Sequence, residues 1–198
     1  MSSIENSFNS SMILHTSRYL FDNFGFNNVG VDRLCKEANI SKMTFYKYFK
    51  SKEKLIESCL VFNQEYLENE VNTVIESYPK LKPLEILEKI YFLHVDLSGF
   101  YHLMFKAIFE IEKLYPVSFN AVVDYRSWLV NVLVKFFSNI TDENVVNEIN
   151  LLLFIIDGSI IQLLSSGNVS DREIIWAVFC DKYYNNLEVL NFESSIKK

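Results

Sequence analysis

Hydrophobic residues recur every three or four positions along almost the whole chain, which is the spacing of amphipathic helices. Between residues 9 and 24 this spacing places Ile13, Leu20, Phe21 and Phe24 on one face of a helix that should end at Gly25. Residues that interrupt helices are scarce, because the 198 residues include only five glycines and three prolines. The pattern therefore predicts an all-α fold.

Residues that favour helix ends divide this pattern into about nine helices. They lie at the expected boundaries: Gly25, Ser51, Pro83, Gly99, Tyr115-Pro116, Thr141, Gly167 and Ser170. Among the helices that they define, two short ones are expected at about 31–37 and 42–48, and a long fourth helix is expected from Ser51 to Ser77.

Charge is distributed unevenly along this helical chain, which has a net charge of −6. Residues 1–55 contain eight Lys or Arg and five acidic residues, whereas the remainder contains 11 basic and 20 acidic residues. This asymmetry predicts a small N-terminal module, residues 1–50, that faces an anion, joined to a larger helical domain, residues 51–198. On charge alone, a solvated charged face is the simpler alternative.

The arrangement of residues 31–49 favours the anion-binding reading, because it contains every part of a helix-turn-helix. Asn39 suits a left-handed turn position, and Ser41 can cap the second helix. Phe45 and Phe49, four residues apart, predict the buried face of that helix. Its outward face then carries groups suited to phosphates and base edges in the major groove of DNA: Ser41, Lys42, Met43, Thr44, Lys47 and Tyr48.

Residues 12–56 as a whole resemble the DNA-binding domain of the tetracycline-repressor (TetR) family of transcriptional regulators. "ILHTSRYLFDNFGF" is similar to the first helix of that family, and "VDRLCKEANISKMTFYKYFKSKEKL" is similar to its helix-turn-helix and the following helix. The resemblance implies that Tyr46 and Lys52 contact phosphates and that Lys42, Met43, Thr44, Lys47 and Tyr48 lie nearest the bases.

Three residues depart from the family pattern in this segment, and one of them is Asn39, which replaces the usual turn glycine in a position that Asn tolerates. Gly30 stands where the family usually has a Ser or Thr that caps the helix and touches phosphate, so that only a backbone amide is available here. Met43 replaces a frequently small residue on the recognition helix.

The same resemblance implies a helical ligand-binding domain and a homodimer formed by the last two helices. In agreement, "LLLFIIDGSIIQLL" and "IIWAVFCDKYY" are apolar around most of the helix circumference. The residues expected at the dimer interface are Phe154, Ile160, Ile161, Trp176, Phe179 and Tyr183. Burial of these helices in the core of one subunit is the alternative.

Eight aromatic residues gather within residues 100–128, which predicts an apolar cavity for a small-molecule effector that is hydrophobic or aromatic. Nearby acidic residues favour a cationic effector over a carboxylate. The residues expected to line this site are His94, Phe100, Tyr101, Phe105, Phe109, Phe119, Tyr125, Trp128 and Asp157. The alternative is that most of these aromatic side chains, together with His94, belong to an ordinary core. Asp157 lies within an apolar run and must be paired.

Several other classes of protein are disfavoured. No nucleophile, phosphate-loop or zinc-ligand motif occurs, so we expect no enzyme, no cofactor and no metal site. A site made of His94, Asp96 and His102 would lack ligand-pair spacing. The N-terminus does not resemble a signal peptide, and the apolar run Leu151–Leu164 is too short to span a bilayer, so a cytoplasmic protein without membrane contact is expected.

The leading hypothesis is a ligand-responsive repressor that binds a pseudo-palindromic operator in double-stranded DNA as a dimer and is released by a small hydrophobic or aromatic molecule. The alternative is a TetR-like DNA-binding protein whose C-terminal domain binds a protein partner, as an activator or a chromosome-associated factor. Binding of small molecules would distinguish the two.

Overall fold

The computed structural model describes residues 3–140 and 145–181, and every regular element in these ranges is a helix. The elements are α1 (Ser3–Phe24), α2 (Val31–Glu37), α3 (Lys42–Phe49), α4 (Lys52–Glu76), α5 (Pro83–His94), α6 (Phe100–Glu110), α7 (Pro116–Ser138), α8 (Val146–Ser166) and a further helical segment, residues 171–181. The predicted all-α fold is confirmed. The expected cap Thr141 and the expected interface residue Tyr183 lie outside the described residues.

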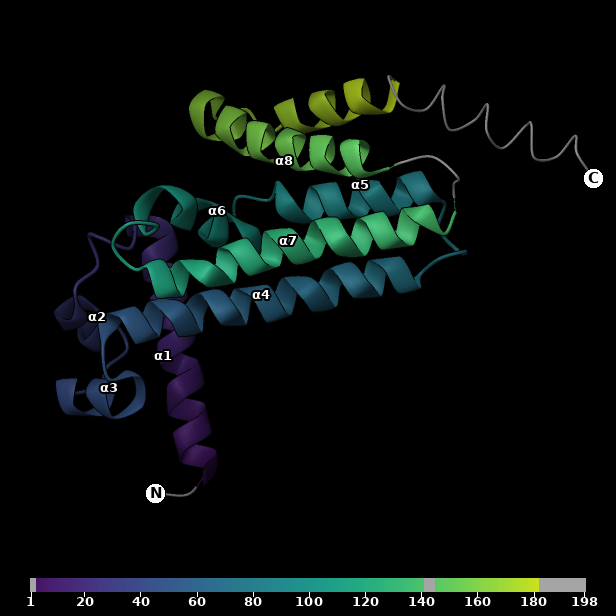
Figure 1. Ribbon diagram of the computed structural model, residues 1–198. Helices are drawn as coiled ribbons and strands as arrows, with labels where there is room; N and C mark the ends of the chain where they lie inside the picture. Colours follow the sequence, from purple (N-terminus) through teal and green to yellow (C-terminus); the bar gives the residue numbers. More distant parts are fainter. Residues whose placement is uncertain (1–2, 141–144, 182–198) are drawn as a thin grey trace, which may run out of the picture.

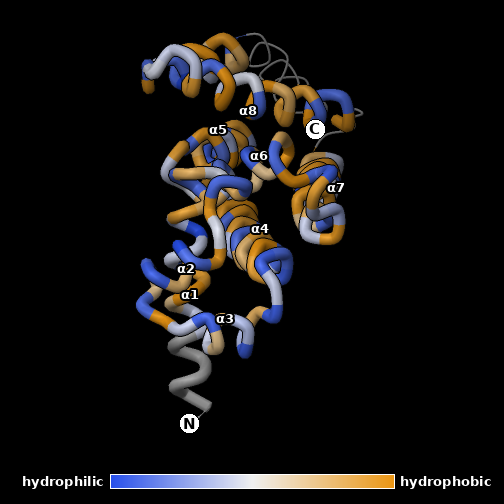
Figure 2. The backbone as a smooth tube through the Cα atoms, turned by 90° about the vertical axis from the view of Figure 1, so that its left-hand side faces the viewer, coloured by the Kyte–Doolittle hydropathy of each residue, from blue (hydrophilic) through white to orange (hydrophobic). Residues whose placement is uncertain are grey.

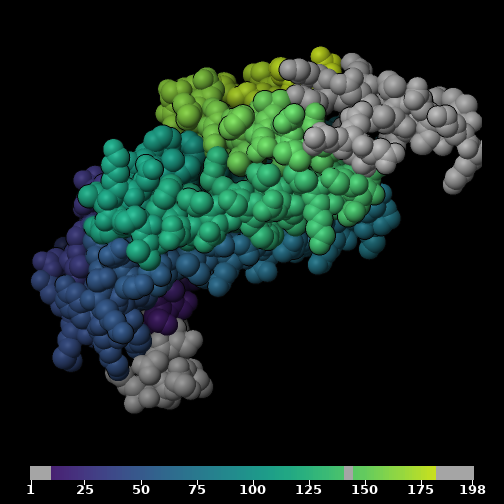
Figure 3. Space-filling view, in the orientation of Figure 1, coloured from purple at the N-terminus to yellow at the C-terminus, as the bar shows by residue number. Residues whose placement is uncertain are grey.

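The helices form an elongated body with the short helices at one end (Figures 1 and 3). The long helix α4 runs from α3 through the body and packs along α7, α6 and α5. Helix α8 and residues 171–181 form the layer farthest from α3 (Figures 1 and 2). Because α4 begins directly after the helix-turn-helix, it connects the N-terminal helices to the rest of the chain.

Helix boundaries follow from the capping residues that the sequence contains. The Ser51 Oγ accepts a hydrogen bond from the backbone N–H of Lys54 at 3.1 Å, as expected for an N-cap. Pro83 occupies the first turn of α5, and Gly167 ends α8 in a left-handed conformation with φ of 66°. Helix α1 begins earlier than the expected residue 9, whereas α6 ends at Glu110, before Tyr115.

The core contains three fully buried tyrosines, and the hydroxyl group of each has a hydrogen-bond partner. Tyr91, Tyr101 and Tyr125 are fully buried. The Tyr91 hydroxyl bonds to the Ser159 Oγ at 2.8 Å and donates to the backbone oxygen of Arg172 at 2.9 Å. These bonds join α5 to α8 and to the segment that follows α8. They also stabilise the fold, because a buried hydroxyl group without a partner would cost free energy.

Helix α8 is 21 residues long, which is longer than the run Leu151–Leu164 that the sequence suggested. By length and composition alone it passes the test for a membrane-crossing helix, as the core helices of globular proteins also do. Its inner face packs on the rest of the chain through Ile149, Leu152, Ile156 and Ile160.

Candidate functional site

The helix-turn-helix consists of α2, the turn at residues 38–41, and α3. Asn39 occupies the turn with φ of 49°, which confirms the left-handed position expected for it. The backbone N–H of Ile40 donates to the Cys35 oxygen at 2.9 Å, and this bond closes the turn. Phe45 and Phe49 of α3 are buried against the core, so the opposite face of α3 is left for solvent or a ligand.

The exposed side of α3 carries most of the residues expected to meet DNA. Met43 is 82% exposed and Tyr46 is 49% exposed. The Ser41 Oγ accepts from the Thr44 backbone N–H at 3.0 Å, so this side chain caps the helix. Tyr48 is half-buried against the core, and Lys47 lies 5.9 Å from the centre of its ring. The side chains of Lys47 and Tyr48 therefore lie side by side at the edge of the exposed face of α3.

Lys42, at the first turn of α3, has a partner that the sequence did not suggest. Its Nζ lies 2.6 Å from the Asp32 carboxylate of α2, and both side chains are largely exposed. The hydrogen bond with Asp32 raises the pKa of Lys42. Asp32 therefore pairs with Lys42, one of the residues expected to meet DNA.

Gly30 and Lys52 lie at the edges of the same surface. Gly30 precedes α2 in an extended conformation, with no other group within 4 Å of where a Cβ would stand. Lys52, at the start of α4, is half-buried; burial lowers its pKa, while the Glu110 carboxylate acts in the opposite direction. A larger side chain would therefore fit at position 30. The Lys52 ammonium lies close enough to Glu110, at the end of α6, for that carboxylate to act on its pKa.

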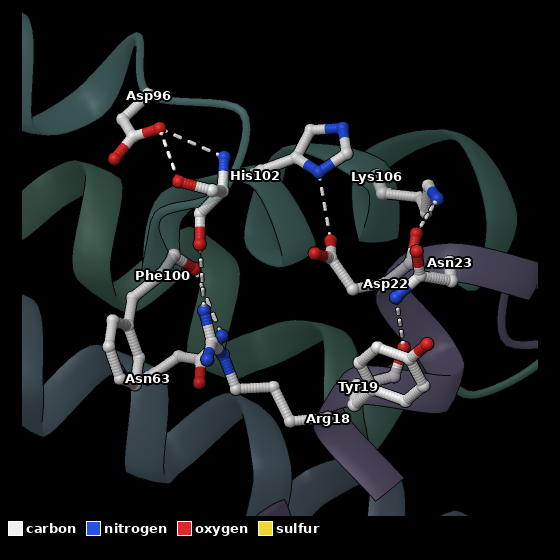
Figure 4. A network of polar contacts seen from close by, with 10 residues as sticks. Arg18, Tyr19, Asp22, Asn23, Asn63, Asp96, Phe100, His102 and Lys106 are labelled. Carbon is white, nitrogen blue, oxygen red and sulfur yellow. Dashed lines mark hydrogen bonds and ion pairs between the residues drawn. The ribbon is translucent and has the colours of Figure 1, made fainter. Parts of the chain in front are cut away.

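Polar contacts join α1 and the loop after it to α6. We call Asp22, His102 and Lys106 the Asp22 cluster (Figure 4). In it, the Asp22 carboxylate bonds to the His102 Nδ1 at 2.8 Å, and the Lys106 ammonium donates to the Asp22 backbone oxygen. At the end of α6, the Glu110 carboxylate accepts from the Phe26 backbone N–H at 2.7 Å. Three consecutive turns of α6 therefore hold the N-terminal helices.

A second group of contacts fixes α1 to the start of α6. The Arg18 guanidinium lies 3.8 Å from the centre of the Phe100 ring, and Tyr66 stacks on the same ring. The Asn63 side chain donates to the Phe100 backbone oxygen at 2.9 Å (Figure 4). Phe100 therefore lies between α1 and α4, and not in the expected ligand cavity.

Two adjacent open clefts lie over α6, α7 and α8. The large cleft has a volume of about 500 Å³ and is lined by Phe105, Ile108, Phe109, Phe119, Val122, Val123, Arg126, Ser127, Asp157 and Ile161. The small cleft, of about 330 Å³, is lined by His102, Phe105, Lys106, Phe109, Glu110, Ile161, Leu164 and Ser165. Phe105, Phe109 and Ile161 line both, so the clefts form one continuous apolar surface with polar groups at its two ends.

Of the residues expected to bind a ligand, Phe105, Phe109, Phe119 and Asp157 line the large cleft. The others do not. Tyr101, Tyr125 and His94 are buried in the core, and Trp128 stacks on Tyr125. The correction follows from helical phase, because Phe119, Val122 and Arg126 share a face of α7 that Tyr125 and Trp128 do not.

The polar end of the large cleft is an ion pair. Arg126 contacts both oxygens of Asp157, at 2.9 and 2.7 Å, and also donates to the Tyr101 hydroxyl. This confirms that Asp157 is paired, although Arg126 was not anticipated as its partner. Burial opposes the charge on Arg126, but its hydrogen bond with Asp157 and the contacts with Tyr101 give a net rise in its pKa.

His94 belongs to the core beneath this ion pair. Its Nε2 lies 2.6 Å from the Tyr125 hydroxyl, and its Nδ1 lies 2.6 Å from the Ile90 backbone oxygen. Burial lowers the pKa of His94 to about 4, so the ring is neutral at neutral pH. His94 and His102 therefore have separate partners, Tyr125 and Asp22, and do not combine with Asp96 as metal ligands.

The residues expected at the dimer interface divide into two groups. Ile160, Trp176 and Phe179 are buried within the subunit, so the structure corrects their assignment to the interface. Phe154 and Ile161 are 68% and 54% exposed. Further exposed apolar residues are Leu164, which is also in α8, and Ile174 and Val178, which lie in the helical segment 171–181. Spacing alone could not separate the inward from the outward face, because both are apolar.

Comparison with known proteins gives a family model and a curated protein that match the N-terminal part of the chain. Residues 13–59 match the family model described as bacterial regulatory proteins, tetR family. A 49-residue stretch is 45% identical to YuxN of Bacillus subtilis (strain 168), an uncharacterised helix-turn-helix-type transcriptional regulator, and spans 25% of this chain and 17% of that protein.

Solved structures match over most of the chain. The crystal structure of SCO4454, a TetR-family transcriptional regulator from Streptomyces coelicolor, superposes with a TM-score of 0.74 at 22% identity, covering 92% of this chain and 95% of that one. AibR, solved in complex with isovaleryl coenzyme A and operator DNA, gives a TM-score of 0.68 at 15% identity, covering 87% and 96%. These structures share the fold.

Proposed function

We propose that the chain is a transcriptional regulator of the TetR family, which binds a pseudo-palindromic operator as a dimer and leaves it when a small molecule occupies the clefts. The observation that carries the proposal is the exposed, cation-bearing face of α3, set on a helical body with an apolar cleft at a distance from it. Such a regulator works in the cytoplasm, where the DNA is.

In this proposal, residues 1–50 form the DNA-binding domain and residues 51–198 form the ligand-binding and dimerisation domain. Thr44, Lys47 and Tyr48 meet base edges, with Met43 as an apolar contact, because they lie on or beside the exposed face of α3. Lys52 and Tyr46 meet phosphates, and the Gly30 amide lies at the edge of the same surface.

The proposed dimer uses the outer face of α8 and residues 171–181. Phe154, Ile161, Ile174 and Val178 are each more than half exposed, and water-exposed apolar groups of this size favour burial against a second subunit. A two-fold dimer would present two copies of α3 to successive turns of the major groove, about 34 Å apart.

The proposed effector is a small molecule with an apolar body. Phe105, Phe109, Phe119 and Ile161 give the clefts an apolar lining, and a volume of about 500 Å³ suits a ligand of drug size. AibR, which has the same fold, was solved in complex with isovaleryl coenzyme A and operator DNA, which supports a small-molecule site in this fold apart from the DNA-binding surface.

DNA binding is tested by sequencing the duplex fragments that the purified protein retains. We expect a pseudo-palindromic sequence whose affinity falls steeply with salt, because cations of the protein displace counterions. Lys52→Ala should weaken all duplexes about equally and reduce the salt slope by about 1, whereas Lys47→Ala should change the preferred sequence. Lys89→Ala, which removes an exposed charge of α5, is the control. Failure to prefer any duplex over random DNA at moderate salt would contradict the proposal.

Effector binding separates this function from the alternative of a protein partner. A ligand that binds the folded chain raises its melting temperature in proportion to the logarithm of ligand concentration over Kd. A ligand found in this way should lower operator affinity in a titration at saturating ligand. If its binding leaves operator affinity unchanged, a protein partner becomes the better explanation.

A further inference from the structure

Lys106 and His102 line the small cleft and also hold the N-terminal helices through Asp22. Both side chains project from α6 one turn apart, and both reach the last turns of α1 (Figure 4). The apolar part of the small cleft is lined by side chains of α6 and α8: Phe105, Phe109, Ile161 and Leu164. A molecule in the small cleft would therefore lie against the contacts that join the N-terminal helices to the body.

The two polar ends of the combined clefts differ in how fully their charges are satisfied. At the end of the large cleft, Arg126 and Asp157 neutralise each other through two hydrogen bonds, and Tyr101 adds a third contact. A cationic ligand would have to separate this pair to reach the carboxylate, which is costly for partly buried charges. The pair is therefore better suited to border an apolar ligand than to bind a charged one.

At the end of the small cleft, the Lys106 ammonium keeps donor capacity. An ammonium group has three donors, and Lys106 gives one to a neutral backbone oxygen of Asp22. The second ring nitrogen of His102 points away from Asp22 (Figure 4). The Glu110 carboxylate also borders this cleft, but it accepts from the Phe26 backbone N–H and lies near Lys52. Lys106 thus has no carboxylate partner among the described contacts.

We infer that the clefts bind an amphiphilic carboxylate whose chain lies on Phe105, Phe109 and Ile161 and whose carboxylate replaces Asp22 as the partner of Lys106 and His102. The inference rests on the proposed function and names its effector class. It replaces the cationic effector expected from the acidic residues of the sequence, because Asp157 is already paired with Arg126. Phe109 is 70% exposed, so an apolar chain would also cover surface that now faces water.

Ligand binding in this mode loosens the attachment of α1 to α6. The His102 and Lys106 contacts with Asp22 are lost together, and the contact between Glu110 and Phe26 is left to hold this side of the N-terminal domain. The two α3 helices of a dimer then lose their fixed spacing. Coupling of typical size would lower operator affinity about 5- to 150-fold, and bound operator would weaken the ligand by the same factor.

The test uses three probes with the same ten-carbon chain: decanoate, decanol and decylammonium, each below the concentration at which it forms micelles. Their affinities for the full chain are measured by calorimetry at neutral pH. We expect decanoate to bind about 10-fold more tightly than decanol, because charge-assisted hydrogen bonds to its carboxylate add to the same apolar contact. Decylammonium should bind no better than decanol.

Variants at position 106 assign this preference to the cleft. Lys106→Gln should reduce decanoate binding to the level of decanol, Lys106→Arg should retain the preference, and Lys89→Gln should behave as the wild type. Lys106→Gln should also weaken operator binding without any probe, since it removes one contact with Asp22. Loss of decanoate binding in the Gln variant with retention in the Arg variant is a result that simple destabilisation of α6 would not give.

Equal affinity for the three probes, or decanoate binding that is unchanged in Lys106→Gln, would overturn the inference. No binding of decanoate up to millimolar concentration would overturn it as well. These failures differ from failure of the proposed function, which is a chain that selects no duplex in the absence of any probe. If decanol released the operator as effectively as decanoate does, the proposed ligand-responsive function would stand, but the inference of an anionic effector would be wrong.

Discussion

Replacing Gly25 by alanine should destabilise the fold by disturbing the contact between the N-terminal helices and α6. Gly25 ends α1 with φ of 80°, a conformation that costs a residue with a Cβ about 1–2 kcal/mol. A Cβ at this position would lie 2.8 and 2.9 Å from the two carboxylate oxygens of Glu110. That carboxylate must then shift, and its hydrogen bond from the Phe26 backbone N–H, worth about 1.5–3 kcal/mol, is weakened or lost.

Together these effects predict a loss of about 2–4 kcal/mol in the free energy of unfolding for Gly25→Ala, or about 4–16 °C in melting temperature for a chain of this size. The assay is urea denaturation of four proteins: the wild type, Gly25→Ala, Glu110→Ala and the double variant. In the Glu110→Ala background the new methyl group meets no carboxylate, so Gly25→Ala should cost only its conformational term. Gly30→Ser, at an open position with negative φ, should be neutral. The same cost for Gly25→Ala in both backgrounds would refute the proposed collision with Glu110.

Three further predictions concern charge, assembly and pH. Asp32→Asn frees Lys42 for phosphate and removes a nearby negative charge, so DNA affinity at low salt should rise several-fold and the salt slope should steepen by about 1; weaker binding in a fluorescence titration would contradict this. Phe154→Glu should convert the dimer to a folded monomer in sedimentation at micromolar concentration, because this side chain is 68% exposed and its change spares the subunit core; a dimeric variant would refute the proposed interface. The pKa of His94 is lowered from 6.5 to about 4, so between these pH values the unfolded chain binds a proton that the folded chain does not, and the free energy of unfolding should fall by about 3 kcal/mol as pH drops from 6.5 to 4. His94→Gln should lose this part of the pH dependence in urea denaturation. If the variant lost as much stability between the two pH values as the wild type, a neutral buried ring would be contradicted.

The sequence predicted the features that depend on residues close together in the chain. Asn39 marked the left-handed turn of the helix-turn-helix, and Ser51 and Gly167 marked the ends of α4 and α8. These predictions succeed because capping and left-handed backbone conformations depend on the residue itself and its immediate neighbours. The buried face of α3 followed in the same way from the spacing of Phe45 and Phe49.

The contacts between the N-terminal helices and α6 could not be predicted in this way. Asp22 and His102 are 80 residues apart, and each alone resembles an ordinary polar residue on an amphipathic helix. Glu110 and Phe26 are 84 residues apart and meet through a backbone N–H group, which leaves no trace in side-chain patterns. A sequence records which face of a helix is apolar but not which helix packs on it.

The aromatic cluster shows the same limit within one helix. Composition placed Phe119, Tyr125 and Trp128 together as candidates for the ligand site, yet they point to different sides of α7. Helical phase could have separated Phe119 from Tyr125. Which side of α7 becomes core and which side lines the cleft depends on where α5, α6 and α8 pack, and helical phase alone does not give that. Arg126 could have been found earlier, since Asp157 required a partner and Arg126 lies within the aromatic region.

Dimerisation and effector binding are coupled if the outer face of α8 is the dimer interface. Ile161 lines both clefts, is 54% exposed, and shares a helix face with Phe154 two turns away. A second subunit on that face would border the clefts and shield the apolar chain of an effector from water. Effector affinity would then increase with protein concentration, and by reciprocity the effector would favour the dimer. Release of operator would in that case come from movement of the N-terminal helices relative to an intact dimer, which is the change that loss of the contacts around Asp22 would permit.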